Sequence, residues 1–287
     1  MASHPFRIVN VFTQGTAPLS GNALCVFENG ESLSDQEMQA LARQFNLSET
    51  TFILPSTRAA ARVRIFTPDY EMPFAGHPTL GSAHVCRALN RGGDSHLLEV
   101  KAGLVPVQAQ GDRWTLKALS ATWRELEVSR NDLAAALGLD ERDIGERPLW
   151  VKAGKEQLVV PLTSTDAVRR AAPVPSKLKN IRNDEGQSMA YVFCRSGSDS
   201  KDSDEALARF FFPAGGAILE DPATGSATAN FGGWCLATQQ PLPVKLKISQ
   251  GEMVDRPSWL YLEVTPEREI FVGGDVVEIG GGTINLR

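Results

Sequence analysis

The sequence repeats Pro78-Thr79-Leu80-Gly81-Ser82-Ala83 as Pro222-Ala223-Thr224-Gly225-Ser226-Ala227. The two copies start 144 positions apart (222 − 78) in a chain of 287 residues, so half of the chain separates them. A run of apolar and small residues follows each copy, at 83–89 and at 227–236. Each copy therefore predicts a turn that leads into a helix, and the spacing predicts two similar halves.

Helix N-termini carry free backbone N–H groups and a partial positive charge, so they attract anions. If a pseudo-twofold arrangement brings the two predicted ends together, they form one pocket suited to a small carboxylate, lined by side chains from both halves. We expect the function to reside in this pocket.

Composition narrows the choice of partners. The chain is 42% hydrophobic, enough for a full core, and is longer than the usual ~100–200 residues of one domain, so we expect two domains. The net charge of −5 and the scattered Lys and Arg residues disfavour a nucleic-acid partner. No apolar run approaches the roughly 18 residues that span a bilayer, and the N-terminus lacks an apolar signal core. We therefore expect a soluble, cytoplasmic protein with no membrane partner.

The sequence predicts neither a metal nor a cofactor. Four widely spaced cysteines, mostly in apolar segments, are typical of reduced buried thiols: Cys25, Cys86, Cys194 and Cys235. A phosphate-binding loop at 76–82 is disfavoured because Ser82 stands where that motif requires Lys. The segment 280–282 is Gly-Gly-Gly but does not precede a helix, so it is typical of a turn rather than a dinucleotide site.

Short strands and a few helices are predicted along the chain. The segment 34–37 is a capping box, and apolar residues recur after it at helical spacing, which predicts a surface helix at 35–45. Strands are expected in the first half at 6–12, 24–28, 51–54, 61–66, 97–101 and 114–119. In the second half they are expected at 149–153, 158–162, 190–194, 245–248, 259–264 and 270–272.

Six motifs, two of which overlap the repeated segments, occur in a fixed order along the chain. They are Gly21-Asn22-Ala23-Leu24, Ser48-Glu49-Thr50, Phe66-Thr67-Pro68, Pro73-Phe74-Ala75-Gly76-His77-Pro78-Thr79, Glu220-Asp221-Pro222-Ala223-Thr224-Gly225-Ser226-Ala227 and Val272-Gly273-Gly274-Asp275-Val276-Val277. In these motifs the chain resembles the phenazine-biosynthesis PhzF-like family over essentially its whole length. It departs from the family at Asp255, where a Gly is usual before Arg-Pro-Ser.

The resemblance implies an α+β fold like that of diaminopimelate epimerase. Two pseudo-symmetric halves are each expected to form a mixed sheet or barrel around a central helix, with the active site in the cleft between them. We expect an N-terminal half at 1–120, a C-terminal half at 121–273, and a final strand at 274–287 that returns to the N-terminal half. The resemblance also implies a homodimer.

Glu49 is the expected general acid/base. On local sequence alone, a carboxylate in this polar stretch before a predicted strand is most simply a solvated loop residue. The Ser-Glu-Thr segment, however, matches the position at which the family carries its acid/base, so the resemblance implies that Glu49 moves the proton. Asn22 follows a glycine and is a candidate for lining the pocket, with a plain turn residue as the alternative.

The two predicted helix entrances supply the remaining candidates. For His77 and Asp221, local sequence leaves helix capping open as the role. The family pattern instead places both in the pocket, as polar contacts to the reacting substrate from opposite halves. It further implies that Gly76, Gly225 and Ser226 hold the substrate carboxylate, since glycine lets the backbone approach a ligand closely.

The residues at the entrances also limit the chemistry. Epimerases of this fold use one thiol at each entrance, but aligning the entrances by their glycines puts Ala75 and Thr224 at those positions. A two-cysteine epimerase or racemase is therefore disfavoured. One carboxylate suits a cofactor-independent isomerase that moves a proton between carbons of a small carboxylate-bearing substrate, as the family's named member does with an amino-hydroxy-diene carboxylate. The alternative is a non-catalytic protein that binds a carboxylate metabolite.

Overall fold

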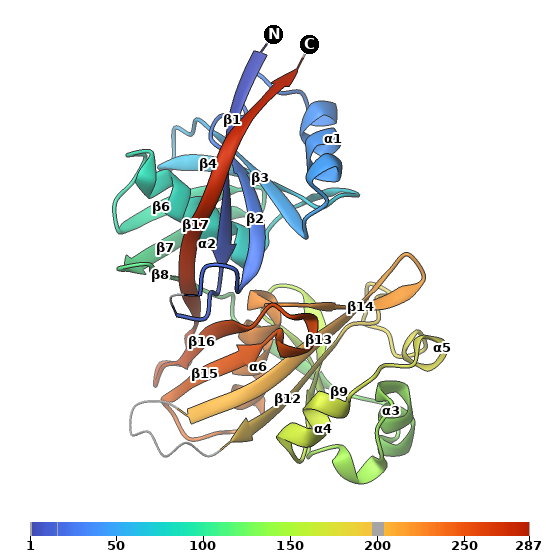
Figure 1. Cartoon of the computed structure of the whole chain (residues 1–287). Helices are drawn as coiled ribbons and strands as arrows, with labels where there is room; N and C mark the ends of the chain where they lie inside the picture. The colour runs from blue at the N-terminus through green and yellow to red at the C-terminus, as the bar shows by residue number, and fades with distance from the viewer. Residues whose placement is uncertain (1, 16, 197–203, 287) are drawn as a thin grey trace. The chain divides into compact units, whose positions relative to one another are not determined.

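The chain folds as two units in the computed structural model, which describes residues 2–15, 17–196 and 204–286. One unit comprises Met1–Lys117 and Gly273–Arg287, and the other comprises Ala118–Val272. The last strand, β17 (Ile270–Leu286), begins in the second unit and continues through the first (Figure 1). Among the described residues, no helix combines the length and the apolar character needed to cross a membrane.

The first unit contains a closed ring of eight strands in the order β17-β1-β2-β3-β4-β6-β7-β8. Its strands are β1 (Ala2–Val11), β2 (Asn22–Phe27), β3 (Glu49–Leu54), β4 (Ala61–Phe66), β5 (Glu71–Met72), β6 (Ser95–Val100), β7 (Gly103–Gln110) and β8 (Arg113–Lys117). The β2–β3 and β4–β6 pairs are parallel, and β5 adds to β4.

The central helix of this ring is α2 (Gly76–Ala88), which contacts β1, β2, β3, β4 and β8. Side chains alternate along β3 between two environments. Thr51 faces α2, where its hydroxyl accepts a hydrogen bond from Ser82, whereas Phe52 packs with Met38 and Leu41 of α1 (Asp35–Phe45). The helix predicted at 35–45 is confirmed, with the Ser34 and Glu37 capping box in place.

The second unit repeats this plan around α6 (Gly225–Ala237), which contacts β9, β10, β11 and β16. Its strands are β9 (Thr122–Glu125), β10 (Leu149–Lys152), β11 (Glu156–Pro161), β12 (Ala190–Ser196), β13 (Asp204–Ala214), β14 (Ala217–Asp221), β15 (Val244–Gln250) and β16 (Ser258–Val264). The remaining helices are α3 (Arg130–Leu137), α4 (Thr165–Arg170), α5 (Pro175–Leu178) and the short 3-10 helices η1 (Glu141–Asp143) and η2 (Glu252–Val254).

The two sheets share one order of strand pairing, which confirms the predicted fold class. The succession β1-β2-β3-β4-β6-β7 in the first unit corresponds to β10-β11-β12-β13-β15-β16 in the second, with parallel pairs at the second and fourth steps of both. The added strand β5 corresponds to β14. Pairs of opposed residues correspond in the same order in the two sheets. In the first unit they are Val9↔Leu24, Val26↔Thr51, Thr51↔Ile65 and Ile65↔Met72. Their counterparts in the second unit are Val151↔Gln157, Val159↔Tyr191, Tyr191↔Phe210 and Phe210↔Asp221.

The predicted register of the duplication is wrong by five residues. The central helices start at Gly76 and Gly225, which are 149 positions apart (225 − 76), and both have 13 residues. The segment 78–83 therefore lies inside α2, whereas Pro222 precedes α6. Proline is tolerated in a first helical turn because its missing N–H has no intrahelical partner there, so Pro78 did not mark a turn.

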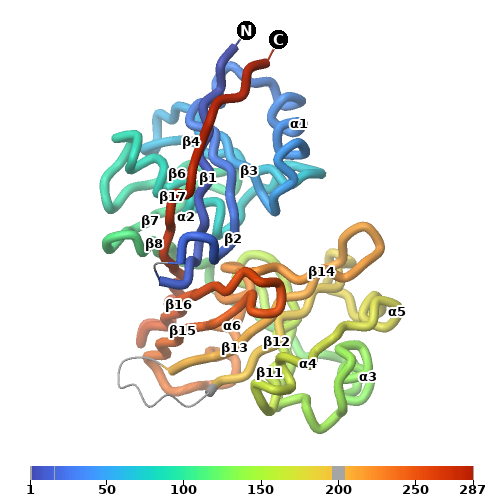
Figure 2. Tube along the Cα trace, viewed as in Figure 1, coloured from blue at the N-terminus to red at the C-terminus, as the bar shows by residue number. Residues whose placement is uncertain are grey.

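The glycines at 280–282 are also not a turn. They belong to β17, which pairs antiparallel with β1 and sets Ala2 opposite Leu286, so the two chain ends run side by side (Figure 2). A Cβ on Gly281 would lie 2.6 Å from the backbone oxygen of Phe6, which explains the need for glycine in this strand.

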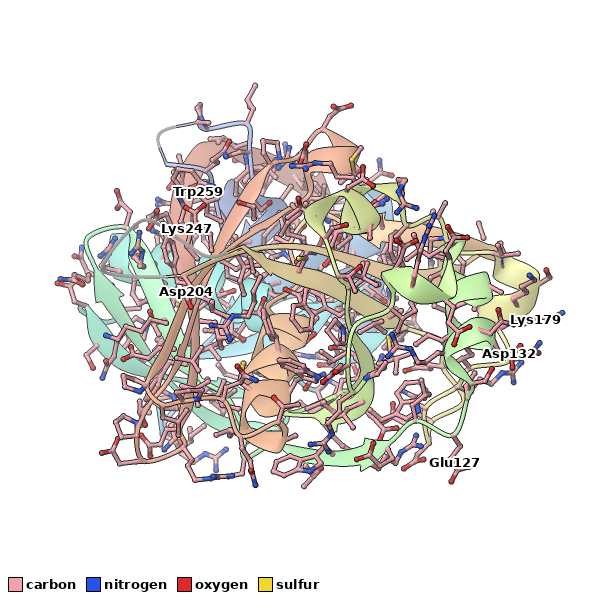
Figure 3. The ribbon with its side chains drawn as sticks, turned by 90° about the horizontal axis from the view of Figure 1, so that it is seen from below. Glu127, Asp132, Lys179, Asp204, Lys247 and Trp259 are labelled. Carbon is pink, nitrogen blue, oxygen red and sulfur yellow. The ribbon has the colours of Figure 1, made fainter. Side chains whose placement is uncertain are left out.

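The β15–β16 pair carries a half-buried contact between a lysine and a tryptophan. There the Lys247 Nζ lies 3.5 Å from the centre of the Trp259 ring (Figure 3). This cation–π contact supports the sheet and is separate from α6.

Candidate active site

Glu49 and His77 meet at the N-terminal end of α2. Glu49 is the first residue of β3 and His77 the second residue of α2, and the Oε2 atom of Glu49 lies 3.3 Å from Nδ1 of His77. Their side chains are 15% and 6% exposed. Glu49 is therefore neither in a loop nor freely solvated, and the loop interpretation of its local sequence is wrong.

Burial keeps the His77 imidazole neutral. Desolvation lowers its pKa from 6.5 to about 3, and a hydrogen bond to the backbone of Ala23 opposes this shift only in part. The contact with Glu49 is therefore not an ion pair. An ionised carboxylate only accepts hydrogen bonds, so the contact favours the tautomer with the proton on Nδ1. Among the described residues, Nε2 of His77 is buried without a hydrogen-bond partner.

Asn22 is a strand residue and not a turn residue. It is the first residue of β2, 3% exposed, and pairs with Val11. The turn is made by Gly21, whose φ is +78° and whose hypothetical Cβ would lie 2.5 Å from the Val11 oxygen. Ala23, the partner of His77, directly follows Asn22.

The second entrance is organised by a buried glutamine, Gln250, at the end of β15. Its Nε2 donates to the Asp221 carbonyl over 2.9 Å and to Oγ1 of Thr224 over 3.0 Å, while its Oε1 accepts from the Thr224 N–H over 3.3 Å. The Thr224 hydroxyl in turn donates to Oδ2 of Asp221 over 2.6 Å. Asp221 ends β14, and the N-cap residue of α6 is Thr224, so the capping role considered for Asp221 is wrong.

Ser226, in the first turn of α6, is held by a second amide. Nε2 of Gln157 donates to Oγ of Ser226 over 3.1 Å, and Gln157 accepts in turn from Asn230. Sequence reasoning missed Gln157, Asn230 and Gln250. One signal was available, because Asn230 is a polar residue in the middle of an otherwise small and apolar helical run.

Both helix entrances leave their first backbone N–H groups without side-chain caps. The N-cap residues are Ala75 and Thr224, which the alignment by glycines placed at equivalent positions, and the side chain of neither makes a capping hydrogen bond. Neither first turn contains an acidic residue. Such ends can bind an anion. That Gly76, Gly225 and Ser226 do so stays a prediction.

The repeated scaffold carries different chemistry in its two copies. Asp221 occupies the ladder position of Met72, and both precede their helix by four residues. In the same way Ser226 corresponds to His77. Each entrance therefore has a carboxylate beside a polar side chain, Glu49 with His77 and Asp221 with Thr224, at positions that are not equivalent. This arrangement does not suit a symmetric pair of identical acid/base groups.

Two of the thiols lie near the C-terminal ends of the central helices, away from the N-terminal ends. Cys86 and Cys235 occupy equivalent positions in α2 and α6, again 149 apart (235 − 86). Burial raises the pKa of each thiol to about 12, so neither is a thiolate at neutral pH. Within residues 2–15, 17–196 and 204–286, no cluster of three His, Cys, Asp or Glu side chains could hold a metal ion.

Over residues 9–284 the sequence matches the family of phenazine biosynthesis-like proteins. The chain belongs to this family. It is 36% identical to an uncharacterized isomerase of Pasteurella multocida, over 99% of this chain and 95% of that protein. It is 32% identical to the trans-2,3-dihydro-3-hydroxyanthranilate isomerase of Pseudomonas fluorescens, over 99% and 100% of the two chains.

Among solved structures, a PhzF-family phenazine biosynthesis protein of Bacillus anthracis superposes with a TM-score of 0.86 at 22% identity, covering 100% of both chains. This likeness shows a shared fold. Membership of the phenazine biosynthesis-like family confirms the resemblance seen in the motifs, and its named members identify the chain as an isomerase. The family gives the class of reaction and leaves the substrate open.

Proposed function

We propose that this isomerase moves a proton between two carbons of a small carboxylate-bearing substrate, without a cofactor, and that Glu49 is its general acid/base. The observation that carries the proposal is the 3.3 Å contact between Glu49 and His77 at the start of α2. It fixes a largely buried carboxylate beside a neutral hydrogen-bond donor, which is an arrangement suited to proton transfer.

In the proposed reaction, Glu49 takes a proton from a substrate C–H bond. The electron pair of that bond moves into the conjugated system, and Glu49 returns the proton to another carbon of that system. His77 lies against the carboxylate without adding a charge, because its pKa is about 3. No other group needs to be oxidised or reduced, and the substrate and product have the same composition.

The same proposal assigns the substrate carboxylate to the helix entrances. Gly76, Gly225 and Ser226 would hold it through backbone N–H groups and the Ser226 hydroxyl, with Asn22 lining the site and Asp221 making a polar contact. The uncapped N–H groups of the two entrances support this assignment, since anions bind where such donors are free of side-chain caps.

As the first candidate substrate we propose trans-2,3-dihydro-3-hydroxyanthranilate, after which several relatives are named. This compound carries a carboxylate for the helix entrances and a diene through which a proton can be relocated. We also propose a homodimer, which light scattering coupled to size exclusion tests directly.

The function is tested by incubating the protein with this compound in deuterated water and following deuterium at carbon by NMR. We expect incorporation with the wild type and a rate lower by about 10²–10⁴-fold with Glu49→Gln, the range typical of a lost general base. Glu31→Gln, at an exposed position, is the matched control. Unchanged exchange in Glu49→Gln would reject the assignment of the base, and binding without any exchange would favour the non-catalytic alternative.

A further inference from the structure

Asn230 anchors a buried chain of hydrogen bonds in the second unit. The backbone N–H of Ala153 donates to Oδ1 of Asn230 over 2.6 Å, and Nδ2 of Asn230 donates to the Lys155 carbonyl over 2.9 Å. A backbone N–H can only donate and a carbonyl can only accept, so these two bonds fix which end of the Asn230 amide is oxygen. Asn230 is fully buried, so water does not replace either partner.

The fixed orientation of the Asn230 amide determines the orientation of the Gln157 amide. The second Nδ2 hydrogen of Asn230 donates to Oε1 of Gln157 over 2.8 Å, so the nitrogen of Gln157 must face the other way. That nitrogen donates to Oγ of Ser226 over 3.1 Å. Since Oγ accepts from Gln157, the hydroxyl hydrogen of Ser226 is directed away from Gln157 and can be donated to a ligand.

The first unit shows that the fold itself does not need these hydrogen bonds. The helix position equivalent to Asn230 is Gly81 (230 − 149), and the ladder position equivalent to Gln157 is Leu24. There the contact is apolar, with a hypothetical Gly81 Cβ only 2.6 Å from Cδ2 of Leu24. A buried polar network is harder to satisfy than an apolar contact, so its presence beside Ser226 points to a function at that residue.

We propose that Asn230 and Gln157 are positioning residues that hold the Ser226 hydroxyl as a hydrogen-bond donor. They would make the entrance of α6 selective for an acceptor such as a carboxylate, and against a group that presents N–H, such as a carboxamide. The inference rests on the proposed role of Ser226 in substrate binding and adds the origin of its selectivity.

The Asn230→Asp variant is expected to reverse the direction of the hydrogen bond between Gln157 and Ser226 while changing the shape of the side chain very little. A carboxylate at this position still accepts from the Ala153 N–H, but it can donate neither to Gln157 nor to the Lys155 carbonyl. The Gln157 amide then turns its nitrogen toward the new carboxylate and its oxygen toward Ser226. The Ser226 hydroxyl donates to that oxygen, and Oγ is left to the ligand as an acceptor.

The first measurement needs no ligand. In the wild type, NMR of the free protein should show a cross-relaxation contact between the Gln157 side-chain amide protons and the β-protons of Ser226. Gln157→Leu assigns the signals, and Asn230→Asp should remove the contact. The hydrogen bonds that run from Asn230 through Gln157 to Ser226 form the Asn230 relay. If the wild type lacks the NMR contact, or if Asn230→Asp retains it, this relay is refuted whatever the enzyme's substrate is.

The second measurement compares binding of 3-hydroxyanthranilate and its carboxamide by calorimetry. We expect the wild type to favour the carboxylate and Asn230→Asp to lower the ratio of the two affinities by about 10- to 100-fold, the effect of one hydrogen bond to a charged group. Asn183→Asp is the matched control, since Asn183 is a buried amide of the same unit that donates to the Glu156 carbonyl. Its affinity ratio should equal that of the wild type.

A double-mutant cycle with Ser226→Ala separates hydroxyl direction from added charge. If the hydroxyl carries the effect, Asn230→Asp should not change the ratio in the Ser226→Ala background. A loss that persists there is a charge effect and overturns the proposal. If the wild type binds neither probe, the proposed substrate class is wrong, while the relay is still decided by the NMR contact.

Discussion

Nδ1 of His77, in the first turn of α2, lies 3.3 Å from Oε2 of Glu49, at the first residue of β3. Two residues 28 positions apart (77 − 49) thus place a neutral imidazole against a carboxylate in a largely buried setting. His77 differs from a catalytic histidine that changes charge near neutral pH, because burial keeps its ring neutral over that range.

The burial of His77 predicts a pH-dependent stability. Its pKa is about 3 in the folded protein against 6.5 when unfolded, so the unfolded state binds one more proton between these values. Stability should therefore fall as the pH drops below about 6.5, by up to ~1.4 kcal/mol per pH unit from this group. Urea unfolding of wild type and His77→Gln from pH 8 to 4 measures the difference. We expect the difference in unfolding free energy between the two proteins to be constant above about pH 7.5. Below that, the wild type should lose stability relative to His77→Gln; a constant difference throughout would contradict the prediction.

Replacing Gln250 should weaken both the fold and the site. Gln250 is 1% exposed, and Gln250→Leu removes the acceptor of the buried Thr224 N–H and the bond to the Asp221 carbonyl. Each buried polar group that loses its partner costs about 1–3 kcal/mol, so we expect unfolding free energy to drop by at least ~2 kcal/mol. Turnover should fall as well, because Thr224 orients Asp221. Gln240→Leu, at a half-buried position after α6 where the side chain bonds Arg195 and Thr238, is the control. Equal stability of the two variants would refute the role of Gln250.

Asp255 tests the one departure from the family pattern. Its backbone is left-handed, with φ 54° and ψ 28°, a conformation that glycine adopts freely and β-branched residues resist. We expect Asp255→Gly to keep or raise thermal stability, within about 1 kcal/mol, and Asp255→Val to lower it by about 1–2 kcal/mol. Thermal unfolding of the three proteins measures this order. A Val variant as stable as the Gly variant would show that this turn is not constrained.

The buried thiols predict resistance to alkylation. Since the pKa values of Cys86 and Cys235 are raised to about 12, iodoacetamide at pH 7.5 should leave both unmodified in the native protein and modify them after unfolding. Activity should survive the treatment. Mass spectrometry of the alkylated protein, with activity measured in parallel, provides the check. Inactivation that follows modification of either thiol would revive a thiol-based mechanism.

Local patterns predicted those parts of the molecule that depend on neighbours in sequence. The capping box at 34–37 and the spacing after it located α1 to the residue, since a helix start is set by side chains within one turn of it. The motifs around Glu49 and His77 identified the family and hence the fold class. The family pattern placed both residues in the site, whereas their contact and the neutrality of His77 are set by the tertiary structure.

The sequence by itself determined the duplication, the two helix entrances and the family. Tertiary structure decided between the 144-residue register of the repeated motif and the 149-residue register of the glycine alignment, in favour of the second. It also revealed Gln250, Gln157 and Asn230 as the residues that orient the second entrance. The physical reason is the range of the interactions. A helix start or a strand is encoded by adjacent side chains, whereas the hydrogen-bond partner of a buried amide depends on which strands pair and in which register, and these join residues up to 77 positions apart (230 − 153) in the Asn230 relay.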